Sequence, residues 1–388
     1  MQEGVTVGAI LVAPAAALPK RGFLELLWLG CKAHGVFFVF ALTYLLLVQA
    51  LVVFMPGFQA RNALDVLKVF SVSILPLMFT GLLFFKATEL FVHHRPKHPA
   101  LLLVRMMWDV LASRQKMAAA LPMVMALFIF NYDFAMIKAN ITTFQPFAWD
   151  VAFDRIDTAL HLGYRPWEVL QPIFGYAPIT LLLNLNYNLW FFVMILFWVY
   201  YAVLAEPGER RTHFFLAFMS LWLVGGGLLA VVFSSAGPCF YGDGRLGLSP
   251  DPYAPLMAYL REVNQHVPIW AVATQDILWS LREQNSAFGG VSAMPSMHNG
   301  TTLLFLLASR GFPRAVRLLL LFHAVFVFIG SIALGWHYAI DSYLAWIVAL
   351  AAWWAMKPVA RWWEDSRPER AFRAALGLPL RTGQEASA

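Results

Sequence analysis

The sequence predicts an all-helical protein that crosses a membrane about eight times. Of its 388 residues, 60% are hydrophobic and only 13% are charged, whereas a soluble domain carries roughly 25% charged residues. The mean hydropathy is +0.64, and the apolar residues gather in runs long enough to cross about 30 Å of hydrocarbon. Composition therefore excludes an ordinary soluble domain. The formal net charge of +6 indicates no nucleic-acid partner, because the basic residues cluster in particular loops, as membrane orientation requires.

Eight apolar runs define the expected spans. They lie near residues 35–55, 69–92, 119–137, 179–204, 213–235, 296–310, 314–336 and 339–357. The sixth is short for a span unless its helix begins upstream, near Phe288, or is tilted. The glycine triplet 225–227 in the fifth run indicates a close approach between helices. We expect three regions: an N-terminal segment with two additional spans (1–118), a six-helix core (119–357) and a tail (358–388).

Lysine and arginine indicate the orientation of these spans. They follow the second, fourth, sixth and eighth runs: Arg95, Lys97, Arg105, Arg114 and Lys116; Arg210 and Arg211; Arg310, Arg314 and Arg317; and Arg361, Arg367, Arg370 and Arg373. All four groups lie on one side if there are eight spans and both termini are cytoplasmic. Segments 138–178, 236–297 and 336–339 then lie on the extracytoplasmic face, which in a bacterium is the periplasmic side of the inner membrane.

Two extracytoplasmic segments carry the pattern of surface helices. Residues 150–174 mix acidic, basic and aromatic residues, and Pro166 is placed to begin an amphipathic helix in the membrane interface. Residues 253–284 indicate one or two surface helices broken at Pro268.

Two histidines stand where apolar runs meet the extracytoplasmic face. His298 begins the sixth run and His337 ends the seventh, so both are expected at the same membrane depth. His337 and Asp341 are four residues apart, which places them on one face of a helix that starts near His337. The carboxylate then accepts from one imidazole nitrogen and fixes the tautomer. Ionisable residues in such positions are candidates for function.

This constellation is suited to phosphorus chemistry. Free backbone N–H groups at the start of the helix of His298, after Ser296, favour an anion. One histidine can attack phosphorus while the other protonates the leaving oxygen, so neither a metal nor a cofactor is required. No HExxH or cysteine-rich ligand set is present. A metal site that combines Asp243 with other carboxylates remains open.

"PSMH" (295–298) and "HYAID" (337–341) resemble the second and third motifs of the type 2 phosphatidic acid phosphatase superfamily. These membrane phosphatases and phosphotransferases have a six-helix core and act through a phosphohistidine. The resemblance covers roughly residues 120–357. It implies that His337 is the nucleophile, that Asp341 orients it and that His298 is the general acid.

The chain departs from that superfamily in its cations. The third motif has a Ser-Arg pair upstream of its histidine, where this chain has Gly330 and Ser331. The first motif, Lys-x6-Arg-Pro, aligns on spacing with Ala230 and Gly237-Pro238. Both of its cations are therefore missing, and other groups must bind the phosphate.

A branch without those cations is the inositol phosphorylceramide synthase and sphingomyelin synthase-like group. Segment 234–244 resembles its loop containing proline and aromatic residues, and segment 137–167 resembles the Lys, Asp and Gly-x-x-Pro-Trp stretch of inositolphosphotransferases. The candidate replacement cations on the same face are Lys138, Arg155, Arg165, Arg245 and Arg261. Arg245 leads because it is nearest in sequence to the lost motif. Ser296 and the Tyr241 hydroxyl are further candidates for binding phosphate.

The expected function is transfer of a phosphoryl or phospho-alcohol group, of the inositol phosphate type, between lipids. The expected partners are a phospholipid donor and a lipid alcohol or water as the acceptor. The chief alternative is a phosphatase of polyprenyl or sugar-lipid phosphates. A proton-coupled transporter that uses the same three residues as a relay, and a catalytically inactive lipid-binding relative, also remain. The sequence leaves the donor, the acceptor and the oligomeric state open.

Overall fold

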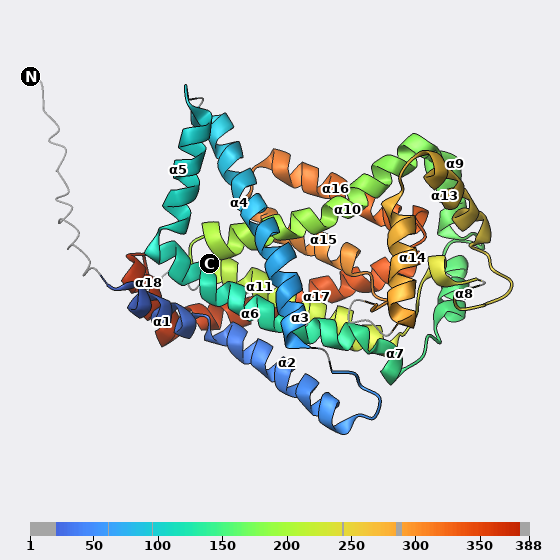
Figure 1. The fold of residues 1–388 in the computed structure, drawn as a ribbon, viewed down its shortest axis with the longest axis horizontal. Helices are drawn as coiled ribbons and strands as arrows, with labels where there is room; N and C mark the ends of the chain where they lie inside the picture. The colour runs from blue at the N-terminus through green and yellow to red at the C-terminus, as the bar shows by residue number, and fades with distance from the viewer. Residues whose placement is uncertain (1–20, 61, 95, 243, 285–288, 381–388) are drawn as a thin grey trace, which may run out of the picture.

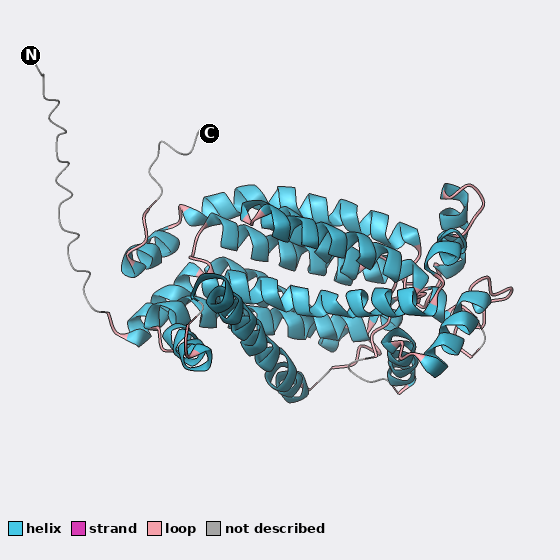
Figure 2. Cartoon of the chain, turned by 90° about the horizontal axis from the view of Figure 1, so that it is seen from above, coloured by secondary structure: helices cyan, strands magenta, loops and turns pink. Residues whose placement is uncertain are grey.

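The structure is a computed structural model that describes residues 21–60, 62–94, 96–242, 244–284 and 289–380. These residues form helices and connecting loops and contain no strand, which confirms the all-helical prediction. Most of the long helices run roughly along the longest axis of the molecule, and the segment of residues 63–92 crosses them obliquely (Figures 1 and 2).

Seven helical segments in the described residues are long and apolar enough to cross a membrane. They are α2 (Gly35–Phe54); Ala63–Val92, which contains α3 (Ala63–Val69) and α4 (Leu75–Glu89); α6 (Arg114–Ala139); Ala177–Leu204, which contains α10 (Ala177–Val199); Glu209–Val232, which contains α11 (Glu209–Leu221), η4 (Trp222–Leu229) and α12 (Ala230–Val232); α16 (Arg314–Ala333); and α17 (Ala339–Glu364). The chain is therefore an integral membrane protein. α17 runs past residue 357, where the C-terminal tail was expected to begin.

The sixth expected span is a short helix. α15 (Met297–Ala308) has 12 residues and ends in the 3₁₀ turn η6 (Ser309–Gly311). At 1.5 Å per residue it is about 18 Å long, which is too short to span a bilayer alone. Residues 289–296 are not helical, so α15 does not extend upstream toward Phe288, a residue outside the described ranges. Instead it packs against α16 and α17.

Shorter helices cover the two ends of the bundle. At one end lie α1 (Phe23–Ala33), α5 (Pro99–Leu111) and α18 (Arg367–Leu376). At the other lie α7 (Ile141–Phe144), α8 (Asp150–Leu160), α9 (Pro166–Phe174), α13 (Ala254–His266) and α14 (Trp270–Glu283) (Figure 1). The predicted helix start at Pro166 and the break at Pro268 are confirmed. The separate helix α8 was not predicted.

The glycine triplet shapes the interior where α6, η4 and α15 meet. η4 is a π-helix. A Cβ atom on Gly226 would lie 2.7 Å from Cε2 of Phe134, and one on Gly225 would lie 3.2 Å from Sδ of Met297. The close approach predicted at the glycines is therefore made by side chains of neighbouring helices, which pack directly on the glycine backbone. It brings Phe134 and Met297 against η4, where both help to line a cavity.

α11 lies at the centre of the bundle. Every residue from Arg211 to Leu221 is buried, and the helix packs along α17. By contrast, the outer helices α2, α4 and α16 expose large apolar residues such as Leu46, Phe79 and Leu319. Apolar side chains on the outer surface are expected where helices face lipid.

Candidate active site

The segment between α16 and α17 holds His337 against Asp341. Backbone N–H groups of Trp336 and His337 both donate to the carbonyl of Ser331 at 3.0 Å, which closes the turn after α16. α17 begins at Ala339, two residues later than the i, i+4 argument assumed. The expected contact nevertheless forms, because the Asp341 carboxylate reaches back from the first turn of α17.

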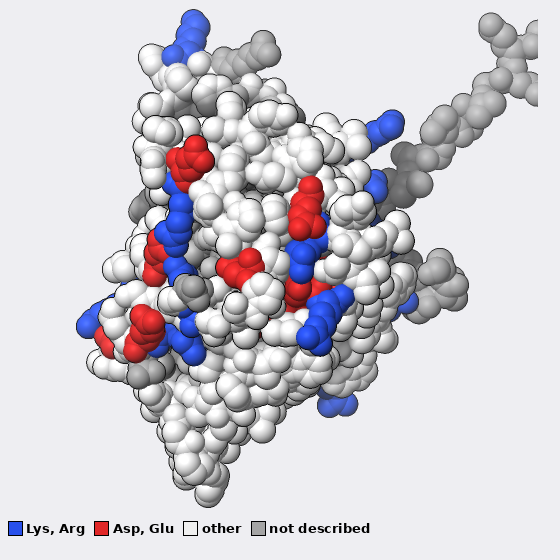
Figure 3. All heavy atoms as spheres, turned by 90° about the vertical axis from the view of Figure 1, so that its right-hand side faces the viewer, with Lys and Arg blue, Asp and Glu red and all other residues white. Residues whose placement is uncertain are grey.

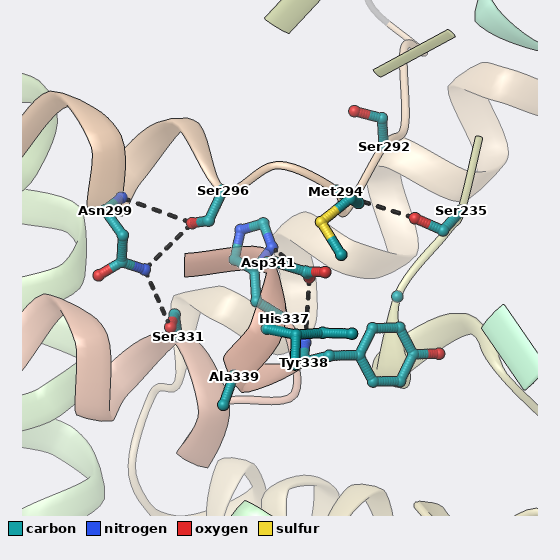
Figure 4. A network of polar contacts seen from close by, with 12 residues as sticks. Ser235, Ser292, Met294, Ser296, Asn299, Ser331, His337, Tyr338, Ala339 and Asp341 are labelled. Carbon is teal, nitrogen blue, oxygen red and sulfur yellow. Dashed lines mark hydrogen bonds and ion pairs between the residues drawn. The ribbon is translucent and has the colours of Figure 1, made fainter. Parts of the chain in front are cut away.

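Asp341 fixes one side of the histidine. Its Oδ2 lies 3.1 Å from Nδ1 of His337 and accepts the N–H of Tyr338 at 3.0 Å, as Figure 4 shows. The other ring nitrogen is Nε2, and a backbone hydrogen bond with Ala293 also acts on the ring. His337 is buried at 7% exposure and Asp341 at 0%. Burial, and to a lesser extent the nearby charge of Lys138, lower the pKa of His337 to about 3. The imidazole is therefore neutral at neutral pH, as a nucleophile must be.

His298 faces His337 from the first turn of α15, with the two ring centroids 6.2 Å apart. Its ring lies between two aromatic side chains of α10: Tyr187, stacked at 4.4 Å, and Trp190 at 4.1 Å. No local pattern in the sequence indicated this arrangement, since α10 lies more than a hundred residues earlier. The two aromatic rings hold His298 in position.

The start of α15 is tied to the turn that carries His337. Ser296 caps α15 by accepting the N–H of Asn299, and its own N–H donates to the carbonyl of Asp341 at 3.0 Å. The Asn299 side-chain amide donates to the hydroxyls of Ser296 and Ser331 (Figure 4). Ser296 is fully buried. Its contacts are those of a helix cap that links the two histidine motifs.

α8 supports the same turn with buried carboxylates. Asp157 accepts the N–H groups of Ala339 at 3.0 Å and Ile340 at 3.2 Å. These are the first two residues of α17, whose N–H groups lack partners within the helix. A carboxylate there also interacts favourably with the helix dipole. Asp157 therefore caps α17 from another helix. Burial raises the pKa of Asp157, and these hydrogen bonds oppose that shift.

Asp150, the first residue of α8, joins two loops of the site. Its carboxylate accepts the N–H groups of Ala236 at 2.9 Å and Gly237 at 2.8 Å, and the hydroxyl of Tyr338 at 2.9 Å. It thus links the loop in the place of the first motif to the turn of the third. Burial raises the pKa of Asp150, while these donors lower it.

The backbone at Gly237, the position that matches the arginine of the first motif by spacing, leaves no room for a side chain. Its φ is +104°, and a Cβ atom there would lie 2.6 Å from the carbonyl oxygen of Trp336. No side chain fits without moving the backbone before His337. The backbone donors of this loop are already bonded to Asp150, so they do not offer a substitute phosphate site in this structure.

A cavity of about 350 Å³ lies in front of both histidines. Its walls are mainly apolar and aromatic, and include Phe134, Trp190, Trp222 and Trp336. Lys138, at the end of α6, is the only Lys or Arg among its lining residues. Its Nζ donates to the hydroxyl of Ser292 at 2.6 Å, and none of the described carboxylates forms an ion pair with it.

The other predicted cations lie elsewhere. Arg245 and Arg261 both pair with Asp276, and Arg165 pairs with Asp154. They belong to the mixed-charge end of the molecule, where acidic and basic side chains are interspersed (Figure 3). Arg155 is exposed on α8. None of the four lines the cavity.

Tyr241 also lies outside the cavity lining. It is buried in an aromatic cluster with Tyr253 and Tyr338. Burial raises the pKa of its hydroxyl.

A metal site was left open at Asp243, which lies outside the described residues. Within the described ranges, no group of three or more His, Cys, Asp or Glu side chains is arranged to hold a metal ion.

Comparison with known proteins gives one match. The family model described as PAP2 superfamily matches residues 152–355, which is more than half of the chain. The matched segment contains His298, His337 and Asp341 and begins inside α8. No curated protein and no solved structure matches the chain.

Proposed function

Because the chain belongs to the PAP2 superfamily, whose members are phosphatases and phosphotransferases of lipid phosphates, we propose that it moves a phosphoryl or phospho-alcohol group from a membrane lipid through His337. The observation that carries this proposal is the pairing of His298 and His337 across one cavity. Their ring centroids are 6.2 Å apart, so one phosphorus group can contact both. Asp341 and the turn before α17 orient the nucleophile.

In the first step, Nε2 of His337 attacks phosphorus and forms an N–P bond. The P–O bond to the leaving group breaks, and His298 gives a proton to the leaving oxygen. The Asp341 carboxylate stabilises the imidazolium character that develops on His337 through Nδ1. In the second step an acceptor oxygen attacks phosphorus, the N–P bond breaks, and His298 takes the proton of the acceptor. A lipid alcohol as acceptor makes the reaction a transfer, and water makes it a hydrolysis.

Lys138 supplies positive charge to the transferred group. It lines the cavity together with both histidines, and its ammonium group contacts a serine hydroxyl and no described carboxylate. An ammonium group placed beside developing negative charge stabilises a transition state in a site that excludes water. Lys138 thereby takes the place of one cation lost from the first motif.

The cavity favours a lipid substrate and transfer to another lipid. Its walls are mainly apolar and aromatic, and the loop of Ala236 forms part of its lining. Such walls suit an apolar chain or the ring face of a polyol headgroup. This supports inositol phosphate-type transfer between lipids, with hydrolysis of a polyprenyl or sugar-lipid phosphate as the alternative for the same half-reaction.

We place the site on the extracytoplasmic side. The arginines of α5 and α18 lie at the end of the bundle opposite α8, α9, α13 and α14 (Figure 1). Basic residues concentrate on the cytoplasmic side of membrane proteins. Both termini are then cytoplasmic, and in a bacterium the cavity faces the periplasm.

Turnover by the purified protein tests this proposal. The substrates are phosphatidylinositol with a ceramide acceptor, a polyprenyl phosphate and phosphatidic acid, and the products are separated as lipids and free phosphate. We expect His337→Ala and His298→Ala to abolish turnover without unfolding the protein. The exposed His266→Ala serves as the control and keeps full activity. Full activity in His337→Ala contradicts the mechanism.

A further inference from the structure

A second, smaller cleft adjoins the cavity of the histidines. It has a volume of about 30 Å³, and a single water needs on the order of 10–15 Å³, so there is room for a small polar group. Lys138, Gly290 and Val291 line both spaces. The cleft is therefore reached from the side of the cavity where Lys138 lies. Thr142 and Arg282 complete its polar lining.

Arg282 is held in the wall of this cleft by two aromatic rings. Its guanidinium lies 4.9 Å from the ring centroid of Phe147 and 4.8 Å from that of Trp279. Its Nε is buried and has no hydrogen-bond partner among the described residues. A buried donor without a partner is costly, and a guanidinium is well suited to bind phosphate oxygens. The guanidinium thus contacts two aromatic rings, and its buried Nε lacks an acceptor in the described part of the chain.

The arginine differs from its neighbours at the same end of the molecule. Arg245, Arg261 and Arg165 each form an ion pair with a carboxylate. No ion pair joins Arg282 to any carboxylate in the described part of the chain, and the adjacent Glu283 instead accepts the indole N–H of Trp279 at 2.8 Å. The cationic charge at the cleft is therefore not neutralised by a direct partner.

Two glycines bring the segments of Lys138 and Arg282 together. A Cβ atom on Gly289 would lie 2.4 Å from the backbone nitrogen of Arg282, and one on Gly290 would lie 2.6 Å from the carbonyl oxygen of Lys138. Only glycine permits this approach, which joins the end of α14 to the end of α6. The two cation-bearing segments thus meet at one cleft although they are far apart in sequence.

We propose that this cleft binds a second anionic group of the substrate, a phosphate at the polar end of the lipid that is not the one transferred. Arg282 lines the cleft and not the cavity of the histidines. The group that it binds is therefore a second phosphate beside the one that reacts. Lys138 lines both spaces and lies between the two groups. The inference rests on the proposed function and narrows the substrates to lipids with two phosphates. The second phosphate is either part of a diphosphate or attached to the headgroup.

Binding tests the cleft without chemistry. The full-length His337→Ala protein is titrated with inorganic phosphate and pyrophosphate, and its thermal unfolding is followed. We expect pyrophosphate to bind at least about tenfold more tightly than phosphate, and this preference to disappear when Arg282→Gln is added. Arg261→Gln, which removes an exposed and paired arginine, keeps it. The inference is wrong if the parent shows no preference or if the preference survives Arg282→Gln.

Turnover then identifies the source of the second phosphate. Protein with native His337 is compared on a polyprenyl monophosphate and diphosphate of one chain length, and on phosphatidylinositol and its 4-phosphate. Arg282→Gln should lower kcat/KM about tenfold or more, mainly through KM, for the two-phosphate member of at least one pair, and change its one-phosphate partner less than about twofold. Arg282→Lys should be intermediate. Equal losses on both members contradict the inference, whereas absence of all turnover with an intact pyrophosphate preference contradicts only the proposed function.

Discussion

His337 and His298 occupy different surroundings that suit different roles. His337 is bonded through Nδ1 to a buried carboxylate, which sets its tautomer and, in the proposed mechanism, leaves Nε2 to attack. His298 has no such partner among the described residues and lies between Tyr187 and Trp190. The assignment of nucleophile and acid rests on this asymmetry as well as on the order of the motifs.

Asp341→Asn should lower kcat about 10²–10⁴-fold while the protein stays folded, since a residue that orients and supports the catalytic base in an analogous triad has an effect of this size. An amide still accepts the N–H of Tyr338, so the turn is kept. The measurement is steady-state turnover together with thermal unfolding in detergent. The exposed Asp365→Asn is the matched control. A loss of less than about fivefold would show that Asp341 does not support His337.

Lys138 shows why nearness in sequence is a weak guide to which cation lines the cavity. Arg245 was the leading candidate because it follows the lost first motif, yet it pairs with Asp276. Lys138 comes from α6, about a hundred residues earlier, and lines the cavity. The sequence alone places Lys138 in a set of five cations and ranks Arg245 first. Which cations pair with carboxylates is decided by tertiary contacts, so the ranking could not take it into account.

α8 is the element whose role the sequence left unrecognised. Asp150, Asp154 and Asp157 have the spacing of one helical face, and this is the signal that was available. The stretch was instead interpreted only as a mixture of acidic, basic and aromatic residues ahead of an interfacial helix that begins at Pro166. Two of the three carboxylates accept backbone N–H groups from loops of the candidate site. Those contacts span more than 80 residues of sequence, so local pattern alone does not reveal them.

Asp157→Asn tests whether α8 positions the start of α17. The amide keeps one acceptor oxygen but turns an NH2 group toward the N–H of Ala339 or Ile340. We expect a loss of about 1–3 kcal/mol in stability and a fall in kcat with KM nearly unchanged. Kinetics and thermal unfolding of the variant measure both.

The control is Glu262→Gln, which changes an exposed acid on α13. Wild-type kinetics at a temperature where Asp157→Asn is fully folded would contradict a positioning role for α8.

The helices of the bundle were largely predictable, because long apolar runs carry a strong signal. Seven of the eight expected spans correspond to helical segments of membrane-crossing length. α15 differs because Pro295 precedes it and residues 289–296 form an irregular segment. That irregular backbone lines the cavity at Gly290, Val291, Ser292 and Pro295. Non-helical backbone at membrane depth is tolerated where it is buried in protein or lines a cavity.

The orientation of the whole molecule is testable by cysteine labelling. In a background without Cys31 and Cys239, Arg155→Cys on α8 should react with a membrane-impermeant maleimide added outside intact bacterial spheroplasts. Arg370→Cys on α18 should react only after permeabilisation. The opposite pattern would place the cavity on the cytoplasmic side, and reaction of both from outside would put the two ends on one side.

A covalent intermediate on His337 is the measurement that decides the mechanism. Purified protein is mixed with a lipid donor labelled with ³²P, quenched in base, digested and mapped by mass spectrometry. The account predicts an acid-labile label on His337 in the wild type and in His266→Ala, and none in His337→Ala. Turnover without any labelled histidine, or a label that remains in His337→Ala, would contradict it.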